Sequence, residues 1–470
     1  MRINLTVVEG PHQGKVFAFA GHSNFLVGRA KQANFRIEDQ GKFISRAHFM
    51  VEVNPPLCRL TDMGSTNGTI VNDRPVKAVD LQDGDPITAG KTVLVVSLVD
   101  EPAGTADSSG ATHVIDLGAQ FDPHATGSPS RAGPDRAQQP QTRSQADPTG
   151  LDPTLCRSCS VHQPGPAAGR ASASTLTGGP ALCPTCRDQL LASPQAIPGY
   201  RIVRELGRGG MGVVYLEIRE GDGARVALKT IKPEVASGES EVRRFLREAA
   251  ILSGLDHPHI VAFRESGETD GVLHFAMDFV PGVDASKLLK DHGGPLPPAR
   301  AAALIGQMLQ ALDYAHAKGI VHRDIKPANL LVESEGGRET LKLSDFGLSR
   351  VYQTSKMSGL TMQGDLGGTF AFMAPEQITD LRDARPPVDQ DSAGATLYKL
   401  LTDRYVYDLP KHYPGQVQRI LFNDPVPILA RKPDLPEGLA AVVHRSLARH
   451  PAARFKDVRE RRRALARFAS

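Results

Sequence analysis

The spacing of apolar and polar residues divides the chain into segments of different character. Over residues 1–99, short runs rich in β-branched and aromatic residues, such as 5–8, 47–53 and 92–98, are separated by turns containing Gly, Asn, Asp and Pro. No long helical period interrupts them, and short strands spaced in this way are typical of an all-β sandwich. The pattern therefore predicts two packed sheets, with the loops gathered at one end.

This pattern is lost over residues 100–150, where Pro, Gly, Ala, Ser, Gln and Asp dominate and aromatic residues nearly vanish. Such a composition offers too little apolar surface to offset the entropy cost of ordering the chain. It predicts a disordered linker, in which Ser and Thr residues are solvated.

Regular periods return in residues 199–470. A helical pattern runs over 239–255, and a second, Ala-rich one runs over 301–317 and ends at Gly319. A short apolar run at 330–332 follows and is typical of a strand.

Length and charge narrow the classes of protein to consider. The 470 residues allow about two to four domains. A net charge of +3 gives no reason to expect nucleic acid as the main partner. No apolar run approaches the ~18 residues of a membrane span, and polar residues interrupt any signal-peptide core at the N-terminus. We therefore expect a cytoplasmic protein with no membrane span.

Four of the five cysteines form two C-x-x-C pairs within residues 151–192, namely Cys156, Cys159, Cys183 and Cys186. Two such pairs about 20 residues apart are typical of a tetrahedral structural zinc site, or zinc knuckle. Free or redox-active thiols are the alternative, although the Pro-, Gly- and Ser-rich flanks give no βαβ context for a redox motif. The segment is expected to be unfolded without metal. The fifth cysteine, Cys58, is predicted to be a buried thiol.

The densest group of reactive residues is the stretch His322-Arg323-Asp324-Ile325-Lys326-Pro327-Ala328-Asn329. Pro327 prevents a regular helix there, so the stretch is predicted to be a shaped loop. In such a loop Asp324 can accept a proton from a hydroxyl, Lys326 can neutralise a phosphate, and the amide oxygen of Asn329 can bind a cation.

The pattern H-R-D-x-K-x-x-N resembles the catalytic loop of the protein kinases, and Lys326 resembles their serine/threonine branch. The resemblance covers residues 199–470 and implies a bilobal α+β fold that transfers the γ-phosphate of ATP to Ser or Thr hydroxyls. It implies that Asp324 orients the hydroxyl and accepts its proton. Lys326 and Lys229 would stabilise negative charge on the phosphates.

Other motifs of this family follow in its order and spacing. The G-x-G-x-x-G run is by itself also typical of dinucleotide-binding folds, but here a strand pattern follows where those folds open a helix. The resemblance implies that Glu248 pairs with Lys229, with Glu241 as the alternative partner. The implied site for ATP and for Mg²⁺ or Mn²⁺ comprises Gly207, Gly209, Gly212, Lys229, the hinge residues Met277, Asp278 and Val280, and the two metal-binding residues Asn329 and Asp345.

The resemblance also places an activation segment between Asp345 and Glu376. Arg323 would grip a phosphate on this segment and so order it. Thr369 is expected to contact the catalytic loop. The candidate phosphorylation sites are Thr354, Ser355, Ser358 and Thr361.

Farther along, Asp389 is expected to brace the backbone of the catalytic loop, and Arg454 is expected to pair with Glu376. Asp391 departs from the family, which usually has an aromatic residue there, so we expect different local packing. The basic residues near the C-terminus are predicted to form a solvated helix face; they are Arg459, Arg461, Arg462, Arg463 and Arg467.

Three predicted loops of the N-terminal sandwich carry polar groups, at Gly28-Arg29, at 45–48 and at 65–69. In order and spacing they resemble the forkhead-associated (FHA) domain, a phosphothreonine reader. The resemblance implies that Arg29 and Ser45 hold the phosphate, with Arg46 and Thr66 beside it. Asn67 would bond to the peptide backbone, and His48 would brace the loops from behind.

The sequence thus predicts a multidomain serine/threonine kinase of the bacterial type, with an FHA-like reader (1–99), a linker (100–150), a zinc segment (151–192) and a kinase domain (199–470). Its expected partners are protein substrates and phosphothreonine-containing proteins, or its own phosphorylated segment, within one chain or in a transient dimer. Autophosphorylation of the activation segment is expected to raise activity. The alternative is a phosphopeptide-binding scaffold with a weakly active or inactive kinase fold.

Overall fold

The structure is a computed structural model. It describes residues 2–38, 43–55, 57–99, 113–116, 197–209, 212–231, 239–269, 271–346, 370–380 and 384–469.

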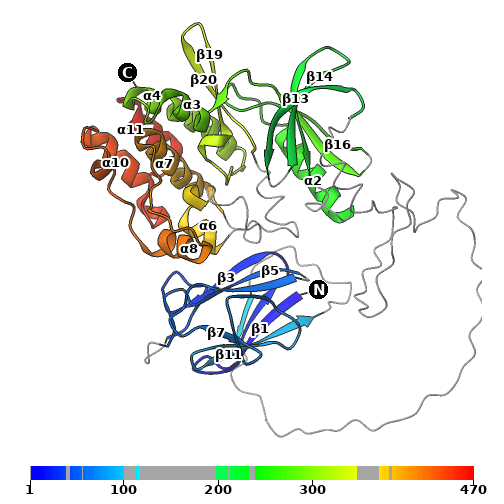
Figure 1. The fold of residues 1–470 in the computed structure, drawn as a ribbon, viewed down its shortest axis with the longest axis vertical. Coiled ribbons are helices and arrows are strands. Elements are labelled where there is room, and N and C mark those ends of the chain that lie inside the picture. The colour runs from blue at the N-terminus through cyan, green and yellow to red at the C-terminus, as the bar shows by residue number, and fades with distance from the viewer. Residues whose placement is uncertain are drawn as a thin grey trace, which may run out of the picture. The chain divides into compact units, whose positions relative to one another are not determined.

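The N-terminal part is a sandwich of two β-sheets, as the pattern of short strands predicted (blue to cyan in Figure 1). One sheet has the order β12-β2-β1-β11-β10-β7-β8, and the other has the order β4-β3-β5-β6-β9. The strands are β1 (Arg2–Glu9), β2 (Lys15–Phe19), β3 (Ser23–Gly28), β4 (Phe35–Arg36), β5 (Phe49–Asn54), β6 (Leu57–Asp62), β7 (Thr69–Val71), β8 (Arg74–Val76), β9 (Ala78–Asp80), β10 (Pro86–Ala89), β11 (Thr92–Val99) and β12 (His113–Asp116).

Alternation along the strands turns one face of each sheet toward a shared core. In β1, Ile3 and Leu5 are fully buried, while Asn4 between them is partly exposed. Phe17 of one sheet packs on Phe25 of the other, with ring centroids 4.7 Å apart. Cys58 is a buried free thiol, as predicted, and burial raises its pKa to about 12. A thiol with so high a pKa is a packing group rather than a nucleophile.

The sandwich extends beyond residue 99. His113–Asp116, inside the predicted linker, forms β12 and pairs antiparallel with β2, so that His113 lies opposite Ala18 and Asp116 opposite Lys15. The prediction of a disordered linker is therefore wrong at these four residues. Two β-branched residues in a row and the backbone groups at the β2 edge explain the added strand.

A second sheet-based part begins at Tyr200 (green in Figure 1). Its five strands have the order β13-β14-β15-β17-β16. Helix α2 begins at Glu239, as predicted, and ends at Leu252 rather than at residue 255; its Phe245 packs near Phe275 of the sheet, with ring centroids 6.3 Å apart. The elements are β13 (Tyr200–Gly209), β14 (Gly212–Arg219), β15 (Arg225–Ile231), α2 (Glu239–Leu252), β16 (Phe263–Thr269) and β17 (Val272–Asp278).

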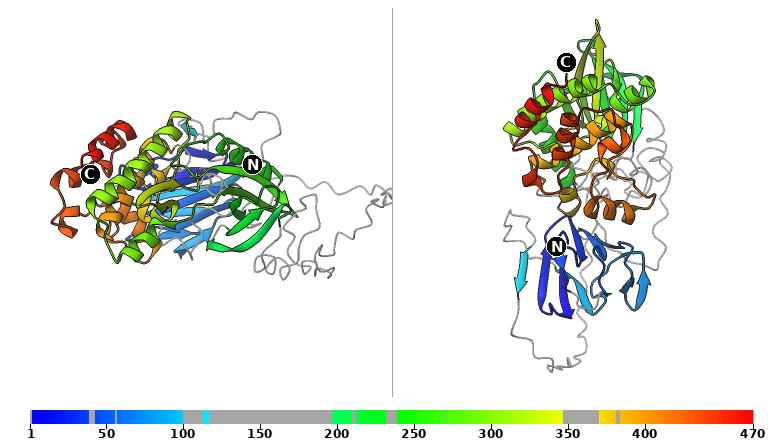
Figure 2. Two further views of the ribbon diagram at one scale, coloured as in Figure 1. Left: turned by 90° about the horizontal axis from the view of Figure 1, so that it is seen from above. Right: turned by 90° about the vertical axis from the view of Figure 1, so that its left-hand side faces the viewer.

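The remaining residues are mainly helical, and Figures 1 and 2 show the orange and red helices gathered on the side away from the green strands. The helices are α3 (Ala285–His292), α4 (Pro298–Ala317), η2 (Pro327–Asn329), η3 (Phe370–Phe372), α6 (Pro375–Thr379), α7 (Pro386–Thr402), α8 (Tyr413–Phe422), α9 (Ile428–Arg431), α10 (Glu437–Ser446), η4 (Pro451–Ala453) and α11 (Val458–Ala466). A small sheet of β18 (Val283–Asp284), β19 (Leu330–Glu335) and β20 (Arg338–Leu343) carries the predicted strand at 330–332.

Helix α7 is the centre of this helical part, because almost every residue along it is buried. Apolar side chains of α4, α7 and α10 form one core with the small sheet. Gly394 of α7 faces α10 so closely that a Cβ atom there would lie 2.9 Å from the Cβ atom of Ser446. This contact is shorter than side chains tolerate, so the packing of α7 on α10 requires glycine.

In the last helix, α11, the prediction of a fully solvated basic face is wrong for one residue. Arg459, Arg462, Arg463 and Arg467 are exposed, as expected of a solvated face, but Arg461 is fully buried. Its guanidinium donates a hydrogen bond to the backbone oxygen of Gln390 over 2.7 Å. Burial lowers the pKa of Arg461 to about 9, and the nearby Asp391 carboxylate opposes that shift. A run of like charges gave no sign that one member points inward.

Candidate active site

The catalytic loop is held from below by one buried carboxylate. Asp389 of α7 accepts hydrogen bonds from the backbone N–H groups of His322 (2.9 Å) and Arg323 (2.8 Å), and His316 Nε2 lies 2.7 Å from it. Burial would raise the pKa of Asp389, but these bonds outweigh it and lower the pKa. The prediction that Asp389 braces the loop is confirmed. It holds Arg323 at a φ of 69°, which is uncommon for a residue other than glycine.

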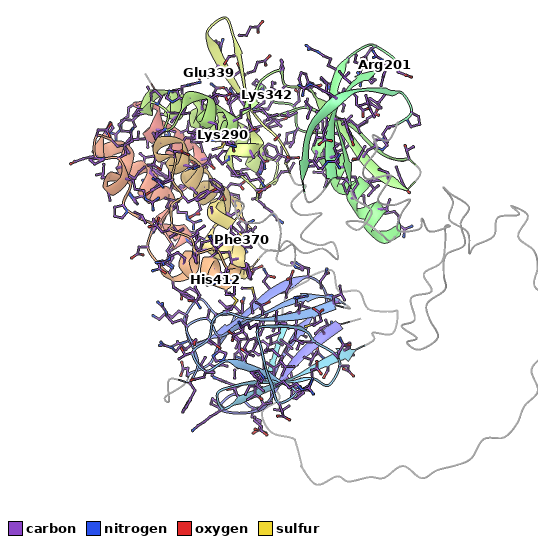
Figure 3. The ribbon with its side chains drawn as sticks, viewed as in Figure 1. Arg201, Lys290, Glu339, Lys342, Phe370 and His412 are labelled. Carbon is purple, nitrogen blue, oxygen red and sulfur yellow. The ribbon has the colours of Figure 1, made fainter. Side chains whose placement is uncertain are left out.

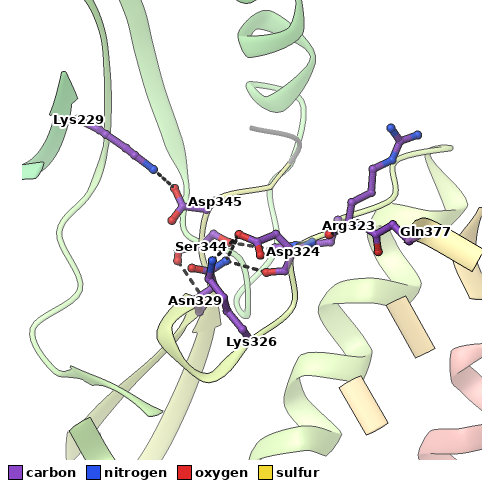
Figure 4. A network of polar contacts seen from close by, with 9 residues as sticks. Lys229, Arg323, Asp324, Lys326, Asn329, Ser344, Asp345 and Gln377 are labelled. Carbon is purple, nitrogen blue, oxygen red and sulfur yellow. Dashed lines mark hydrogen bonds and ion pairs between the residues drawn. The ribbon is translucent and has the colours of Figure 1, made fainter. Parts of the chain in front are cut away.

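Asp324 is fixed by two side chains of its own loop. Lys326 Nζ lies 3.0 Å from Asp324 Oδ2, and the Asn329 amide nitrogen donates to the backbone oxygen (2.7 Å) and to Oδ2 (3.1 Å) of Asp324. Figure 4 shows these groups converging. Because the amide nitrogen of Asn329 is used in this way, its amide oxygen is the atom suited to a cation.

A buried histidine joins this loop to the next motif. His322 Nε2 lies 2.8 Å from the backbone oxygen of Ser344, and His322 Nδ1 accepts the backbone N–H of Asp324 over 3.2 Å. Ser344 in turn donates its backbone N–H to the oxygen of Asn329 over 2.9 Å. These bonds place Asp345, the residue after Ser344, beside the catalytic loop.

Lys229 and Asp345 form an ion pair across the two parts of the domain. Lys229 Nζ, from β15, lies 2.9 Å from Asp345 Oδ1 (Figure 4). Burial alone would raise the pKa of Asp345, but Lys229 reverses this and lowers it, so the carboxylate stays ionised. Glu248 lies in α2, as predicted, but its side chain is outside the described residues. The expected pairing of Lys229 with Glu248 therefore stays a prediction.

The predicted glycine-rich turn lies between β13 and β14. Gly207 and Gly209 end β13 and Gly212 begins β14, so a strand follows the glycines, as predicted, and not the helix of a dinucleotide fold. A Cβ atom on Gly212 would clash with the backbone oxygen of Thr230 on β15. Close approach of the two strands thus explains this glycine.

The predicted hinge begins at the end of β17, whose last two residues are Met277 and Asp278. The Asp278 carboxylate accepts a hydrogen bond from Arg264, with 2.7 Å between Oδ2 and Nη2. The backbone N–H of Asp278 donates to the backbone oxygen of Ala262. Val280 is buried. Met277 lines a small apolar cavity that also reaches Phe346 and Asp345. With the Asp278 side chain occupied, backbone groups are what this segment offers an adenine ring.

In the sandwich, the three predicted loops are bonded to one another. The backbone N–H of Arg29 donates to the oxygen of Ser45 over 3.0 Å, and the Ser45 hydroxyl accepts the backbone N–H of Thr66 over 3.0 Å. Asn67 Nδ2 donates to the oxygen of Phe43 over 3.0 Å. Arg29 and Arg46 are exposed. The structure thus brings together the residues that the sequence singled out.

His48 lies beneath these loops and is fully buried. Its Nδ1 atom accepts the backbone N–H of Ser45 over 3.2 Å, and Nε2 lies 3.0 Å from the oxygen of Gly68. Nδ1 is therefore the acceptor and Nε2 carries the proton. Burial lowers the pKa of His48, so the ring is neutral. These are the contacts expected of a residue that braces the loops.

Asp62 holds the third loop, although it lies before the residues 65–69 that the sequence singled out. Its carboxylate accepts the backbone N–H groups of Gly64 (2.9 Å) and Ser65 (3.0 Å) and the hydroxyl of Thr69 (2.7 Å). The sequence signal for such a bond is an aspartate at the start of a turn, because its side chain can accept the backbone N–H groups two and three residues farther along.

Comparison with known proteins agrees with both sites. Residues 200–456 match the protein kinase domain, and residues 25–90 match the FHA domain. The chain belongs to the protein kinase family. It is 38% identical over 273 residues to serine/threonine-protein kinase PknJ of Mycobacterium tuberculosis, a match that covers 57% of this chain and 45% of PknJ.

Serine/threonine-protein kinase PkaA of Streptomyces coelicolor is 36% identical over 263 residues, covering 54% of this chain and 47% of PkaA. The kinase thus spans about half the length of these curated relatives. A crystal structure of the M. tuberculosis PknI kinase domain is 31% identical; the match covers 58% of this chain and 98% of that one, with a TM-score of 0.47.

The kinase domain contains a charge network that links α6 and α7 to the buried Arg454, the residue after η4. Arg454 Nη2 lies 2.8 Å from Glu376 Oε2, which confirms the predicted pair, and 3.3 Å from Asp391 Oδ2. Burial raises the pKa of Asp391 to about 7, although Arg454 opposes the shift. Where the family usually has an aromatic ring, this kinase has a second carboxylate on Arg454.

Gln377 adds a contact that the sequence did not indicate. Its Nε2 atom donates to the backbone oxygen of Arg323 over 2.8 Å (Figure 4). Since Gln377 follows Glu376, the end of the activation segment is bonded directly to the catalytic loop. No pattern in the sequence links the two residues, because they are far apart along the chain.

Several predicted residues lie outside the described part of the chain. They are the activation-segment candidates Thr354, Ser355, Ser358, Thr361 and Thr369, and the cysteines Cys156, Cys159, Cys183 and Cys186. Within the described residues, no group of three His, Cys, Asp or Glu side chains is placed to hold a metal ion. In the same ranges no helix has the length and apolar character needed to cross a membrane.

Proposed function

We propose that this chain is a serine/threonine protein kinase that transfers the γ-phosphate of ATP to protein hydroxyls. The observation that carries the proposal is the convergence of Asp324, Lys326 and Asn329 with the ion pair of Lys229 and Asp345. The named serine/threonine kinases that match the kinase domain support the substrate class.

The chemistry follows from these side chains. Asp324 accepts the proton of the substrate hydroxyl. The hydroxyl oxygen of the substrate then bonds to the γ-phosphorus, while the bond between the γ-phosphorus and the β-phosphate oxygen breaks and ADP is released. Lys326 neutralises charge on the phosphate in transfer, and Lys229 holds the α- and β-phosphates. Backbone groups at Met277, Asp278 and Val280 bind the adenine, and the glycines at 207, 209 and 212 cover the phosphates.

The residues present also fit Mg²⁺, or Mn²⁺ in its place. Asp345 offers an ionised carboxylate, because Lys229 lowers its pKa, and Asn329 offers an amide oxygen. Oxygen ligands of this kind suit a small hard cation. When bound, the ion would neutralise the phosphate charge, and Lys229 would be released from Asp345 toward the nucleotide.

The test is phosphosite mapping of the full chain after incubation with Mg-ATP. We expect phosphate on one or more of Thr354, Ser355, Ser358 and Thr361 in the wild type, and none in Asp324→Asn. Asp434→Asn, which alters an exposed carboxylate far along the sequence, is the matched control and should label like the wild type. Incorporation by Asp324→Asn at the wild-type rate would rule out the proposed role of Asp324. No labelling in either protein would favour a scaffold.

The sandwich supports a second activity, binding of phosphothreonine peptides. Arg29 and Ser45 would hold the phosphate, Arg46 and Thr66 would lie beside it, and Asn67 would bond the peptide backbone. The match to the FHA domain and the bonded loops support this. Its ligand would be a phosphorylated partner or the activation segment of this kinase, within one chain or in a transient dimer.

The two C-x-x-C pairs support a structural zinc site in residues 151–192. We expect about one zinc per chain, held by thiolates in the tetrahedral manner. Metal analysis should show this zinc lost on replacing Cys183 and Cys186 by serine and kept on replacing Cys58. Absence of zinc from the wild type would refute the assignment.

A further inference from the structure

A cavity of about 550 Å³ lies directly beside the catalytic loop. Lys326, Pro327 and Ala328 form one of its walls, and Lys326 Nζ is the atom 3.0 Å from the Asp324 carboxylate. A chain segment in this cavity would therefore be a close neighbour of the hydroxyl that Asp324 receives. Among the described residues, none of the glycine-rich turn, the hinge or Asp345 lines it, so Lys326 is the one residue that the cavity shares with the groups assigned to the nucleotide.

The other walls come from α3 and from the end of α7. Lys290 lies in the last turn of α3, where Figure 3 labels it, and Lys399 and Asp403 lie at the C-terminal end of α7. Leu289 and Tyr405 add apolar surface. The volume is within the ~300–1,000 Å³ of ordinary ligand sites. It is large enough for a few side chains of a peptide.

The charge of the lining is one-sided. Three lysines, Lys290, Lys326 and Lys399, line the cavity together with one carboxylate, that of Asp403, and Lys326 is already paired with Asp324. Asp403 is already paired, since its Oδ1 atom lies 2.6 Å from Lys399 Nζ. Lys290 is exposed, and among the described residues no carboxylate lies within ion-pair distance of it. With Lys326 and Lys399 each paired to an aspartate, the cavity keeps one unbalanced positive charge, on Lys290, which would attract carboxylates and repel basic side chains.

We propose that this cavity binds an acidic stretch of the protein substrate, so that the kinase selects Ser and Thr residues with Asp or Glu nearby in the sequence. The inference rests on the kinase activity proposed above and specifies its substrate class. Lys290 is the specificity-determining residue, and it contacts the substrate away from the reacting hydroxyl. The apolar surface of Leu289 and Tyr405 packs against the methylene groups of the bound segment.

The experiment uses the full chain and three synthetic peptides that share one acceptor residue and differ only in the flanking positions, which are Glu, Ala or Lys. The kcat/KM of each peptide is measured for the wild type, Lys290→Glu and Lys287→Glu. Lys287 is the matched control, because it is exposed on the same helix, pairs with Asp291 and does not line the cavity.

We expect the wild type to use the Glu peptide best and the Lys peptide worst. Lys290→Glu should lower the Glu-to-Lys preference by roughly fivefold, the upper value of a partly exposed ion pair. The change should appear mainly in KM, with the Ala peptide nearly unaffected. Lys287→Glu should keep the wild-type preference.

Two results would overturn the inference. One is equal use of the three peptides by the wild type, and the other is a preference that Lys290→Glu leaves unchanged. In both cases turnover of the Ala peptide would show that the kinase activity itself stands. If the wild type phosphorylated none of the peptides, including the Ala peptide, the proposed function would fail together with the inference.

Discussion

The catalytic loop and the reader loops of the sandwich both gather groups suited to phosphate, yet different interactions lie beneath them. Under the catalytic loop the buried group is the charged carboxylate of Asp389, which holds the loop backbone, and elsewhere in the same domain the buried Arg454 pairs with Glu376. Under the reader loops the buried group is the neutral ring of His48, and backbone bonds do most of the joining.

This difference has an energetic consequence. Removing one member of a buried charged network leaves another charge or donor unpaired, which costs more than the lost bond itself. Removing an exposed arginine from a loop held by backbone bonds changes binding but not the fold. The kinase domain should therefore be the more sensitive of the two regions to single substitutions.

The largest effect is expected for Asp389→Asn. The amide nitrogen would face one of the two backbone N–H donors, so we expect a loss of about 3 kcal/mol in unfolding free energy. Displacement of the loop should lower kcat by about 100-fold. Calorimetry and peptide phosphorylation check the two effects. Asp434→Asn serves as the control and should be as stable as the wild type. If Asp389→Asn were equally stable, the proposed role of the buried charge would be contradicted.

The next effect concerns the reader. Arg29→Ala should weaken binding of a phosphothreonine peptide by roughly 30-fold or more, the value of a charge-assisted bond to phosphate. Kinase activity and thermal stability should not change. Titration calorimetry measures the affinity, and Arg36→Ala, an exposed arginine of the same sandwich, serves as the control. A loss of thermal stability in Arg29→Ala would mean that this loop, like the catalytic loop, depends on a charged side chain for its structure.

A third effect, spread over several pH units, is expected from pH acting on Asp391. Burial raises its pKa from 3.8 to about 7, so the folded kinase binds a proton here that the unfolded chain has released. Stability from this group is fully present below pH 4 and is lost as pH rises through 7. The difference in unfolding free energy between wild type and Asp391→Asn should change by on the order of 4 kcal/mol over that range. A constant difference would show that Asp391 is ionised throughout.

The smallest effect has the opposite sign and belongs to His48. Burial lowers its pKa, so the unfolded chain takes up a proton before the folded sandwich does. Stability from this group is present above its usual pKa of 6.5 and is lost as pH falls below it. NMR titration of the His48 ring in the full chain should give a midpoint below 6.5. A midpoint at or above that value would mean that the ring beneath the reader loops is charged.

The sequence was sufficient for features that depend on residues close together in the chain. The alternation of β1, the Ala-rich helix α4 and the loop around Pro327 could all be predicted, because local period and turn chemistry determine them. The resemblance to known kinases added two long-range contacts that the structure confirms, Asp389 beneath the catalytic loop and Arg454 on Glu376.

Only the tertiary structure decided which residues become partners when distant segments meet. It buried Arg461 against Gln390, bonded Gln377 to Arg323 and paired β12 with β2. It also brought Lys290, Lys326 and Lys399 around one cavity, although each lysine by itself looks like an ordinary surface residue. Burial and electrostatic fields are summed over neighbours in space, and a linear pattern records only neighbours in the chain.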